Sequence, residues 1–116
     1  MNPLNLFKNT DTLERFAAGA TIFRKGDPGD YMYVVIEGEV DVLADGKYIR
    51  TLSPGDIFGE MSLIDAAPRS ADTVAKSDCV LAPVDERRFL FLVHETPMFA
   101  LHMLEVMARR LRDWQK

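Results

Sequence analysis

The chain has 116 residues, of which 47% are hydrophobic and 28% are charged, with a formal net charge of −4 at pH 7. This length and apolar content suffice for one folded domain with a buried core, and they argue against intrinsic disorder. Apolar runs of only a few residues argue against a membrane span, and the acidic balance argues against general nucleic-acid binding, so an anion would need a locally built site.

The charge is unevenly distributed. Residues 1–85 carry 8 Lys or Arg and 14 Asp or Glu, whereas residues 86–116 carry 6 and 4. The single cysteine, Cys79, precedes the apolar run VLAPV, so we expect a small buried thiol in a reducing compartment. The N-terminal MNPLNLFKN has no basic segment followed by an apolar core, so we predict no secretory signal and expect a cytoplasmic location.

Short strands separated by turns are predicted for most of the chain. All seven glycines lie between residues 19 and 59, and turn sequences such as KGDPGD and SPGD recur about every ten residues. Asp45-Gly46 between two β-prone runs predicts a hairpin. This pattern indicates a small antiparallel roll or sandwich. The expected strands are residues 21–23, 31–36, 40–44, 47–52, 71–75 and 79–84.

Helix is predicted from Glu86 onward. Residues 86–94 form one short segment, and Thr96-Pro97 is typical of an N-cap followed by proline at the first helical position. Apolar residues then recur at helical spacing, which predicts a packed face: Ala100, Met103, Leu104, Met107, Leu111 and Trp114. Phe99, Leu101 and Val106 widen this face, which is consistent with burial against both the roll and a second chain.

The stretch FGEMSLIDAAPRSA, residues 58–71, carries the most distinctive chemistry. A helical turn entered through Gly59 would present backbone N–H groups that have no partner inside the helix, and these suit a phosphate or carboxylate. Arg69 adds a planar fork of donors and Ser70 adds a hydroxyl. An ionised Glu60 only accepts hydrogen bonds, so a sugar hydroxyl beside the phosphate suits it best.

These residues predict a small ligand with one anionic phosphate joined to a ribose. Met61, Ile49 and Val74 would supply an apolar wall for its base. The alternative is an ordinary surface ion pair between Glu60 and Arg69, worth roughly 0–1 kcal/mol, with no ligand at all. Spacing alone leaves both interpretations open.

FGEMSL followed by PRSA is similar to the phosphate-binding cassette of cyclic nucleotide-binding domains, which occur in catabolite activator protein, in the regulatory subunit of cAMP-dependent kinase and in cyclic-nucleotide-gated channels. The resemblance implies an eight-stranded antiparallel β-roll, jelly-roll-like, with C-terminal helices. One domain would span residues 1–116, with the roll over about 12–85 and the helices over about 86–115. The matching residues elsewhere are Phe23, Gly26-Asp27, Gly29-Asp30, Tyr33, Gly38, Val40, Gly55-Asp56 and Phe58-Gly59-Glu60.

The resemblance also implies roles for individual residues. Glu60 would hold the ribose 2′-hydroxyl and Arg69 would pair with the cyclic phosphate. The rest of the cradle would come from Gly59, Met61, Ser62, Ser70 and Ala71. In this family the C-terminal helix swings over the pocket and caps the base, a role for which the candidates here are Arg109, Arg110, Leu111 and Trp114.

The implied function is a non-enzymatic cyclic nucleotide sensor, with cAMP favoured over cGMP. Its expected partners are the nucleotide and either a second copy, through the C-terminal helix, or an effector protein. We expect no cofactor, no membrane contact and no direct nucleic-acid contact, because the ARRLR run at 108–112 is typical of a solvated helix face.

Two other functions stay open. A ligand-free β-roll could serve as a protein-interaction or dimerisation module. A metal-dependent enzyme of similar shape is the third interpretation, but His94 and His102 are eight residues apart near helices, unlike the clustered ligands of metal sites, and no Ser-His-Asp or Cys-His arrangement is evident.

Overall fold

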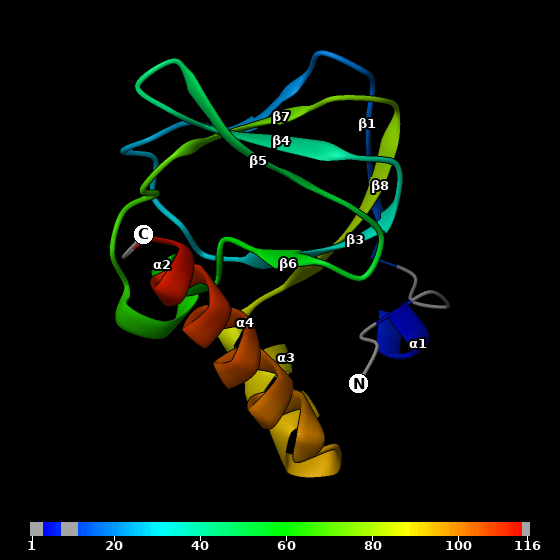
Figure 1. Cartoon of the computed structure of the whole chain (residues 1–116). Coiled ribbons are helices and arrows are strands. Elements are labelled where there is room, and N and C mark those ends of the chain that lie inside the picture. The colour runs from blue at the N-terminus through cyan, green and yellow to red at the C-terminus, as the bar shows by residue number, and fades with distance from the viewer. Residues whose placement is uncertain (1–3, 8–11, 115–116) are drawn as a thin grey trace. The chain divides into compact units, whose positions relative to one another are not determined.

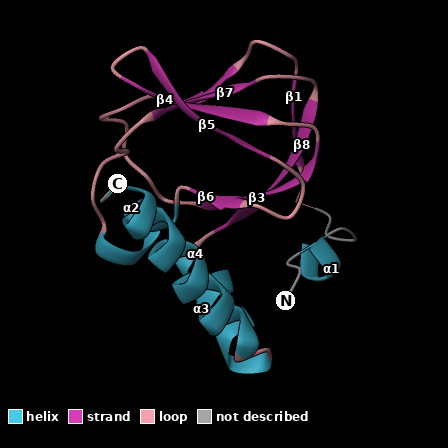
Figure 2. Ribbon diagram, in the orientation of Figure 1, coloured by secondary structure: helices cyan, strands magenta, loops and turns pink. Residues whose placement is uncertain are grey.

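The computed structural model describes residues 4–7 and 12–114. The chain divides into two compact units, residues 2–86 and residues 87–116. The first unit contains strands and two short helices, and the second is helical (Figures 1 and 2). The predicted fold class, an eight-stranded antiparallel roll with C-terminal helices, is confirmed.

Eight strands form two four-stranded antiparallel sheets. One sheet has the order β1-β8-β3-β6, with β1 (Glu14–Phe16), β8 (Cys79–Val84), β3 (Met32–Glu37) and β6 (Ile57–Phe58). The other has the order β2-β7-β4-β5, with β2 (Thr21–Phe23), β7 (Asp72–Ala75), β4 (Val40–Ala44) and β5 (Lys47–Leu52). Two short helices complete the unit: α1 (Leu4–Phe7) precedes the strands, and α2 (Glu60–Asp65) connects β6 to β7.

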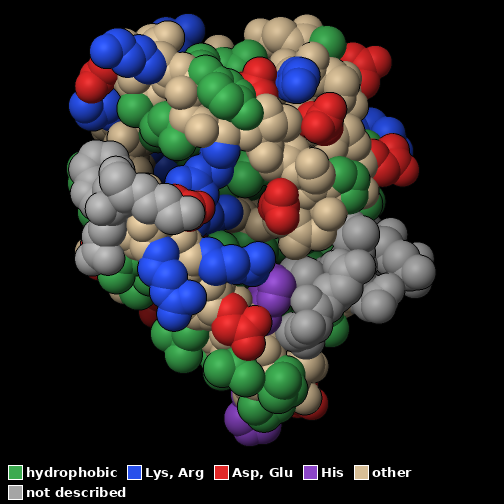
Figure 3. Space-filling view, in the orientation of Figure 1, with side chains coloured by type: hydrophobic (Ala, Val, Ile, Leu, Met, Phe, Trp, Pro, Cys, Tyr) green, Lys and Arg blue, Asp and Glu red, His purple; other side chains and the backbone are tan. Residues whose placement is uncertain are grey.

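The core forms where the inward-facing residues of both sheets meet. Its buried cluster consists of Val35, Val40, Leu52, Phe58, Ala75, Cys79 and Leu81. The side chain of Cys79 is buried as expected, and burial raises the pKa of the thiol. Acidic and basic side chains lie interspersed on the outer face of the strands that Figure 3 shows.

The Asp45-Gly46 hairpin between β4 and β5 forms as predicted. Both residues have positive φ, 53° and 80°, which is the geometry that a two-residue turn needs to match the twist of its strands. The structure contains β1, β6 and α1 in addition to the predicted elements. These three have only two to four residues each, too few to give a periodic signal in the sequence.

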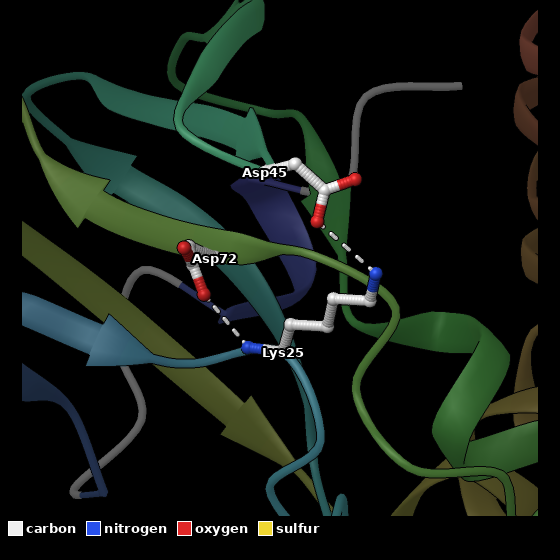
Figure 4. Close-up of polar contacts among 3 residues, drawn as sticks. All are labelled: Lys25, Asp45 and Asp72. Atoms are coloured by element: carbon white, nitrogen blue, oxygen red, sulfur yellow. Dashed lines mark hydrogen bonds and ion pairs between the residues drawn. The ribbon is translucent and has the colours of Figure 1, made fainter.

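The loop between β2 and β3 is tied to the start of β7 by backbone hydrogen bonds. Gly26 N donates to Arg69 O at 2.8 Å, and Arg69 N donates to Asp27 O at 2.9 Å. Lys25 adds a further link to β7, since its backbone N donates to Asp72 Oδ1 at 2.8 Å, and its Nζ lies 3.3 Å from Asp45 Oδ1 in the β4–β5 turn (Figure 4). This loop therefore has a fixed position beside Arg69.

The second unit consists of most of α3 (Glu86–Glu95) together with α4 (Met98–Trp114). Phe89 and Phe99 meet edge to face with ring centroids 5.9 Å apart. The predicted first helical position, Pro97, lies one residue before the observed start, and its carbonyl accepts a hydrogen bond from Ala100 N. No single described helix is long and apolar enough to cross a membrane; α3 and α4 pass that test only as a pair, bent by 116°.

The predicted apolar face of α4 was wrong in its register. Leu104 and Leu111, expected on the packed face, are exposed, whereas Phe99 and Val106, expected at its margin, are buried. Met103 is buried as predicted. Leu101 is exposed on the same side as Leu104 and Leu111, so α4 carries one buried and one exposed apolar stripe.

Candidate functional site

The predicted helical turn after Gly59 is present as α2. Gly59 adopts a left-handed conformation, φ 75° and ψ 10°, and α2 begins at the next residue with no side-chain cap. A second left-handed residue, Ala66, with φ 58°, ends the helix. Glycine is needed at 59 because other residues rarely adopt this conformation, and because a Cβ there would lie 2.6 Å from Nη1 of Arg69.

The side chain of Arg69 lies at the centre of this region and is only 5% exposed. Its Nη1 donates to Gly59 O at 3.0 Å, and its Nη2 donates to Tyr31 O at 2.6 Å. The guanidinium carbon lies 4.1 Å from the centroid of the Phe23 ring, a cation–π contact. Arg69 therefore joins the entry of α2, the β2–β3 loop and the end of β2.

The electrostatic surroundings of Arg69 favour its charged form against the effect of burial. Burial lowers the pKa of the guanidinium, whereas Tyr33 and the carboxylates of Asp30, Asp27 and Glu60 act in the opposite direction. An arginine keeps its charge near neutral pH. Its Nε is buried without a hydrogen-bond partner, so one donor of the fork is not used within the described chain.

Glu60 and Arg69, the two charged ends of the predicted motif, are brought together inside the roll. Glu60 is 4% exposed and lies close enough to Arg69 to act on its charge. The alternative of an ordinary surface ion pair is wrong, because both side chains are buried. A cation and an acceptor-only carboxylate are thus both buried near the start of α2, and the carboxylate acts on the charge of the cation.

The other predicted cradle residues fall into two groups. Ser62 is buried against the β2–β3 loop, so closely that a Cβ placed on Gly29 would overlap its side chain. Met61 and Ser70 have exposed side chains, and Ala71 is half-buried. Their expected roles as ligand contacts stay predictions.

Two predicted base-lining residues, Val74 and Ile49, do not face the inside of the roll. Val74 follows the inward-facing Thr73, and its cross-strand neighbours are Thr21 and Asp41, so it lies on the outer face of the sheet. Ile49 is exposed on β5. These positions do not favour an apolar wall built from Val74 and Ile49.

The four predicted lid residues belong to the helical unit. Arg109 and Leu111 are exposed and Arg110 is half-buried. The Trp114 side chain lies outside the described part of the structure. Capping of the base by any of them stays a prediction.

Three residues of this region were not predicted as site residues. Tyr31 contributes only its backbone carbonyl, which no sequence pattern reveals. Phe23 was recognised only as part of the family pattern, although its ring carries the Arg69 guanidinium. Thr73, a polar residue at an inward position of β7, breaks the expected alternation, and this was the one signal available in the sequence.

No arrangement suited to a metal ion occurs in residues 4–7 and 12–114, where no group of three or more His, Cys, Asp or Glu side chains converges. His94 is exposed beside Glu95, with 3.6 Å between Nδ1 and Oε1.

Comparison with known proteins gives a consistent result. Residues 13–96 match the family described as cyclic nucleotide-binding domain. A cyclic AMP receptor protein of Thermus thermophilus is 38% identical over 103 residues, which cover 84% of this chain and 48% of that protein. A cAMP-dependent protein kinase regulatory subunit of Eremothecium gossypii is 44% identical over 71 residues, 61% of this chain and 16% of the relative. The chain thus spans about half the length, or less, of these curated relatives.

Solved structures agree with the sequence matches. The crystal structure of Thermus thermophilus catabolite activator protein superposes with a TM-score of 0.83 at 33% identity, covering 97% of this chain and 53% of that one. A structure described with a cyclic-GMP-dependent signalling pathway in bacterial phytopathogenesis has a TM-score of 0.75 at 31% identity, covering 87% and 84%.

Proposed function

The chain belongs to the cyclic nucleotide-binding domain family, and from that premise we propose that it binds cAMP as a regulatory sensor, using Arg69 for the cyclic phosphate and Glu60 for the ribose. The observation that carries this proposal is the burial of both side chains beside the left-handed entry of α2. A buried cation next to a buried carboxylate suits a ligand that presents an anion and a hydroxyl side by side.

The phosphate would replace weaker acceptors of Arg69. Two donors of the guanidinium now bond the carbonyls of Gly59 and Tyr31, and Nε has no hydrogen-bond partner among the residues that the structure describes. A phosphate oxygen carries a formal negative charge, and charge-assisted hydrogen bonds are roughly twice as strong as those between neutral groups. The exchange of carbonyl for phosphate is therefore favourable, and it couples ligand binding to the β2–β3 loop through Tyr31.

The ribose would bind through the carboxylate of Glu60. An ionised carboxylate accepts hydrogen bonds and repels a phosphate, so its partner has to be a donor such as the 2′-hydroxyl. Because the cyclic phosphate spans the 3′ and 5′ oxygens, the 2′-hydroxyl is adjacent to it. Glu60 acts electrostatically on Arg69, which supports neighbouring positions for the two ligand groups.

We assign cAMP rather than cGMP as the ligand on the names of the two curated relatives, both of which refer to cAMP. The relatives are a receptor protein and a regulatory subunit, so the proposed role is regulatory and non-catalytic. Cytoplasmic location and the absence of direct nucleic-acid contact by these residues belong to the same proposal, on the strength of composition and the acidic first unit.

The output of the sensor would be a change in the helical unit. A ligand shifts a conformational equilibrium only as far as it binds one state better than the other. The exposed stripe of α4, formed by Leu101, Leu104 and Leu111, is the surface through which a second copy or an effector would respond.

Thermal unfolding with and without nucleotide tests the proposal. A ligand at about 100 times its dissociation constant adds about 2.7 kcal/mol of stability, which for a domain of this size raises Tm by about 10 °C. We expect that rise with cAMP, a smaller one with cGMP, and none with 5′-AMP, whose phosphate is not cyclic. If millimolar cAMP and cGMP both leave Tm unchanged, the ligand-free interaction module becomes the better account.

A further inference from the structure

Two buried side-chain polar atoms lack a hydrogen-bond partner in the part of the chain that the structure describes, Nε of Arg69 and Oγ1 of Thr73. The first belongs to the group already assigned to the phosphate. The second has no part in the proposed function so far. Thr73 is 2% exposed, so water outside the roll does not reach its hydroxyl.

The position of Thr73 in the sheet connects it to the same site. β7 lies between β2 and β4, and Thr73 pairs across the sheet with Phe23 on one side and with Val42 on the other. Directly opposed residues of neighbouring strands have Cβ atoms about 4.5–5.5 Å apart. Phe23 is the ring under the Arg69 guanidinium, so both unpartnered atoms belong to residues next to one phenyl ring.

The immediate neighbours of Thr73 in the sheet are apolar. Phe23 and Val42 both pack against the buried core, and Ala75, the next inward residue of β7, belongs to it. Valine has nearly the same shape as threonine and would fill this position without a hydroxyl. A buried hydroxyl without a partner is unfavourable, so its presence in an apolar wall points to a partner that arrives from outside the chain.

We propose that the Thr73 hydroxyl hydrogen-bonds the polar edge of the purine base and is a specificity-determining residue of the nucleotide site. This inference rests on the proposed function. Arg69 serves the phosphate there and Glu60 serves the ribose, so the base is the part of the ligand to which that proposal gives no polar partner. A hydroxyl both donates and accepts, which matches the mixed donors and acceptors of a purine edge.

The base wall inferred from Thr73 differs from the one expected from the sequence. The base would lie against the inward face of the sheet β2-β7-β4-β5, beside Thr73 and Val42, rather than against the outward-facing Val74. Apolar side chains with a few polar groups that fix orientation are typical of small-ligand pockets.

The test is calorimetric titration of the full chain with cAMP, cGMP and cIMP, for the wild type and the Thr73→Val variant. We expect Thr73→Val to weaken the preferred nucleotide about tenfold or more, since removing one partner of a buried hydrogen bond leaves the other unpaired. The loss should differ among the three bases. The unliganded variant should melt at the wild-type temperature or higher, because the hydroxyl has no hydrogen-bond partner in the described residues of the free protein.

Two further variants complete the design. Thr73→Ser keeps the hydroxyl and should retain most of the affinity, whereas Thr73→Ala removes it and should reproduce the loss if the valine variant folds poorly. Thr21→Val makes the same substitution at an exposed position of β2 and should leave all three affinities unchanged.

The outcomes separate this inference from the proposed function. If the wild type binds no cyclic nucleotide, both are overturned. If the wild type binds but Thr73→Val binds equally well and melts lower, the hydroxyl serves the free protein, and only the inference about Thr73 is lost. Loss by one common factor for all three bases would mean contact with the sugar or phosphate and would overturn the assignment to the base.

Discussion

Arg69 owes its position to backbone groups more than to side chains. Its own amide and carbonyl are fixed by Asp27 and Gly26, and its guanidinium bonds the carbonyls of Gly59 and Tyr31. The Phe23 ring packs against the guanidinium, 4.1 Å from ring centroid to guanidinium carbon. Such preorganisation lowers the entropy lost when an anion binds, because the fork is already immobile.

Glu60 provides a test of the sugar contact. Hydrogen bonds to charged groups contribute about 1.5–3 kcal/mol, so Glu60→Gln should weaken cAMP binding by roughly 10- to 150-fold. The same loss should appear when wild-type protein is titrated with 2′-deoxy-cAMP. The variant should bind cAMP and 2′-deoxy-cAMP equally, and a variant that still distinguishes them would remove Glu60 from the ribose contact.

Tyr33 makes the free energy of unfolding depend on pH in the alkaline range. Burial, and secondly the Glu14 carboxylate, raises the pKa of Tyr33 above its ordinary value of 10.0. The folded protein then holds this proton more tightly than the unfolded chain, so the contribution to stability is complete below about pH 10 and is lost as pH rises through the folded pKa. Urea unfolding between pH 8 and pH 11 should show this fall in the wild type. Tyr33→Phe should remove that part of the fall, whereas Tyr48→Phe, at an exposed side chain, should preserve it.

At the scale of elements, Gly59 both gives the backbone its left-handed turn into α2 and leaves room for Arg69. A comparison with Gly46 separates these two effects. Gly46 has nearly the same φ, 80° against 75°, but a Cβ there meets nothing within 4 Å. Placing alanine in the left-handed region costs about 1–2 kcal/mol. Gly46→Ala should therefore lower the free energy of unfolding by about that amount and leave cAMP affinity unchanged.

Gly59→Ala should cost more than Gly46→Ala, because the new Cβ would lie 2.6 Å from Nη1 of Arg69 and displace it. It should also weaken cAMP binding. Chemical denaturation and calorimetry on both variants measure the two effects. Equal losses of stability with unchanged affinity would show that Gly59 matters only for the backbone and not for the position of Arg69.

The sequence was informative where a local rule determines the structure. Asp45-Gly46 specifies a hairpin by its backbone preference, and the Gly59 entry to α2 follows from a residue that tolerates positive φ. Glu60 and Arg69 were predicted to belong to one site from their chemistry; both are buried, and their roles toward a ligand stay predictions. The two-residue β6 and three-residue β1 exist only because a neighbouring strand pairs with them, which no local pattern encodes.

The missed parts of the site share a different cause. The Tyr31 carbonyl is a backbone group, so the identity of residue 31 carries no information about it. Val74 was chosen for its apolar character, but a shift of one residue along β7 reverses the face, and the inward residue is Thr73. On β7, strand register rather than residue type determines which side chain faces inward.

On the scale of the whole molecule, the exposed apolar stripe of α4 predicts self-association. Leu101, Leu104, Ala108 and Leu111 follow the 3-4-3 spacing of a coiled-coil seam and are all exposed. We expect sedimentation equilibrium to show a dimer. Leu104→Glu, which places a charge in the seam, should yield a monomer, while Arg109→Ala on the neighbouring exposed face should leave the dimer intact. A monomeric wild type at all concentrations would leave this stripe for an effector protein.

Calorimetric titration of cAMP into wild-type protein and Arg69→Ala tests the central claim most directly, with Arg15→Ala on the exposed face of β1 as the control. The account predicts saturable binding of one nucleotide per chain by the wild type and the control. It predicts a loss of about 2–5 kcal/mol in Arg69→Ala, because one side of a buried charge pair is removed. Equal affinity in all three proteins, or no binding by the wild type, would contradict it.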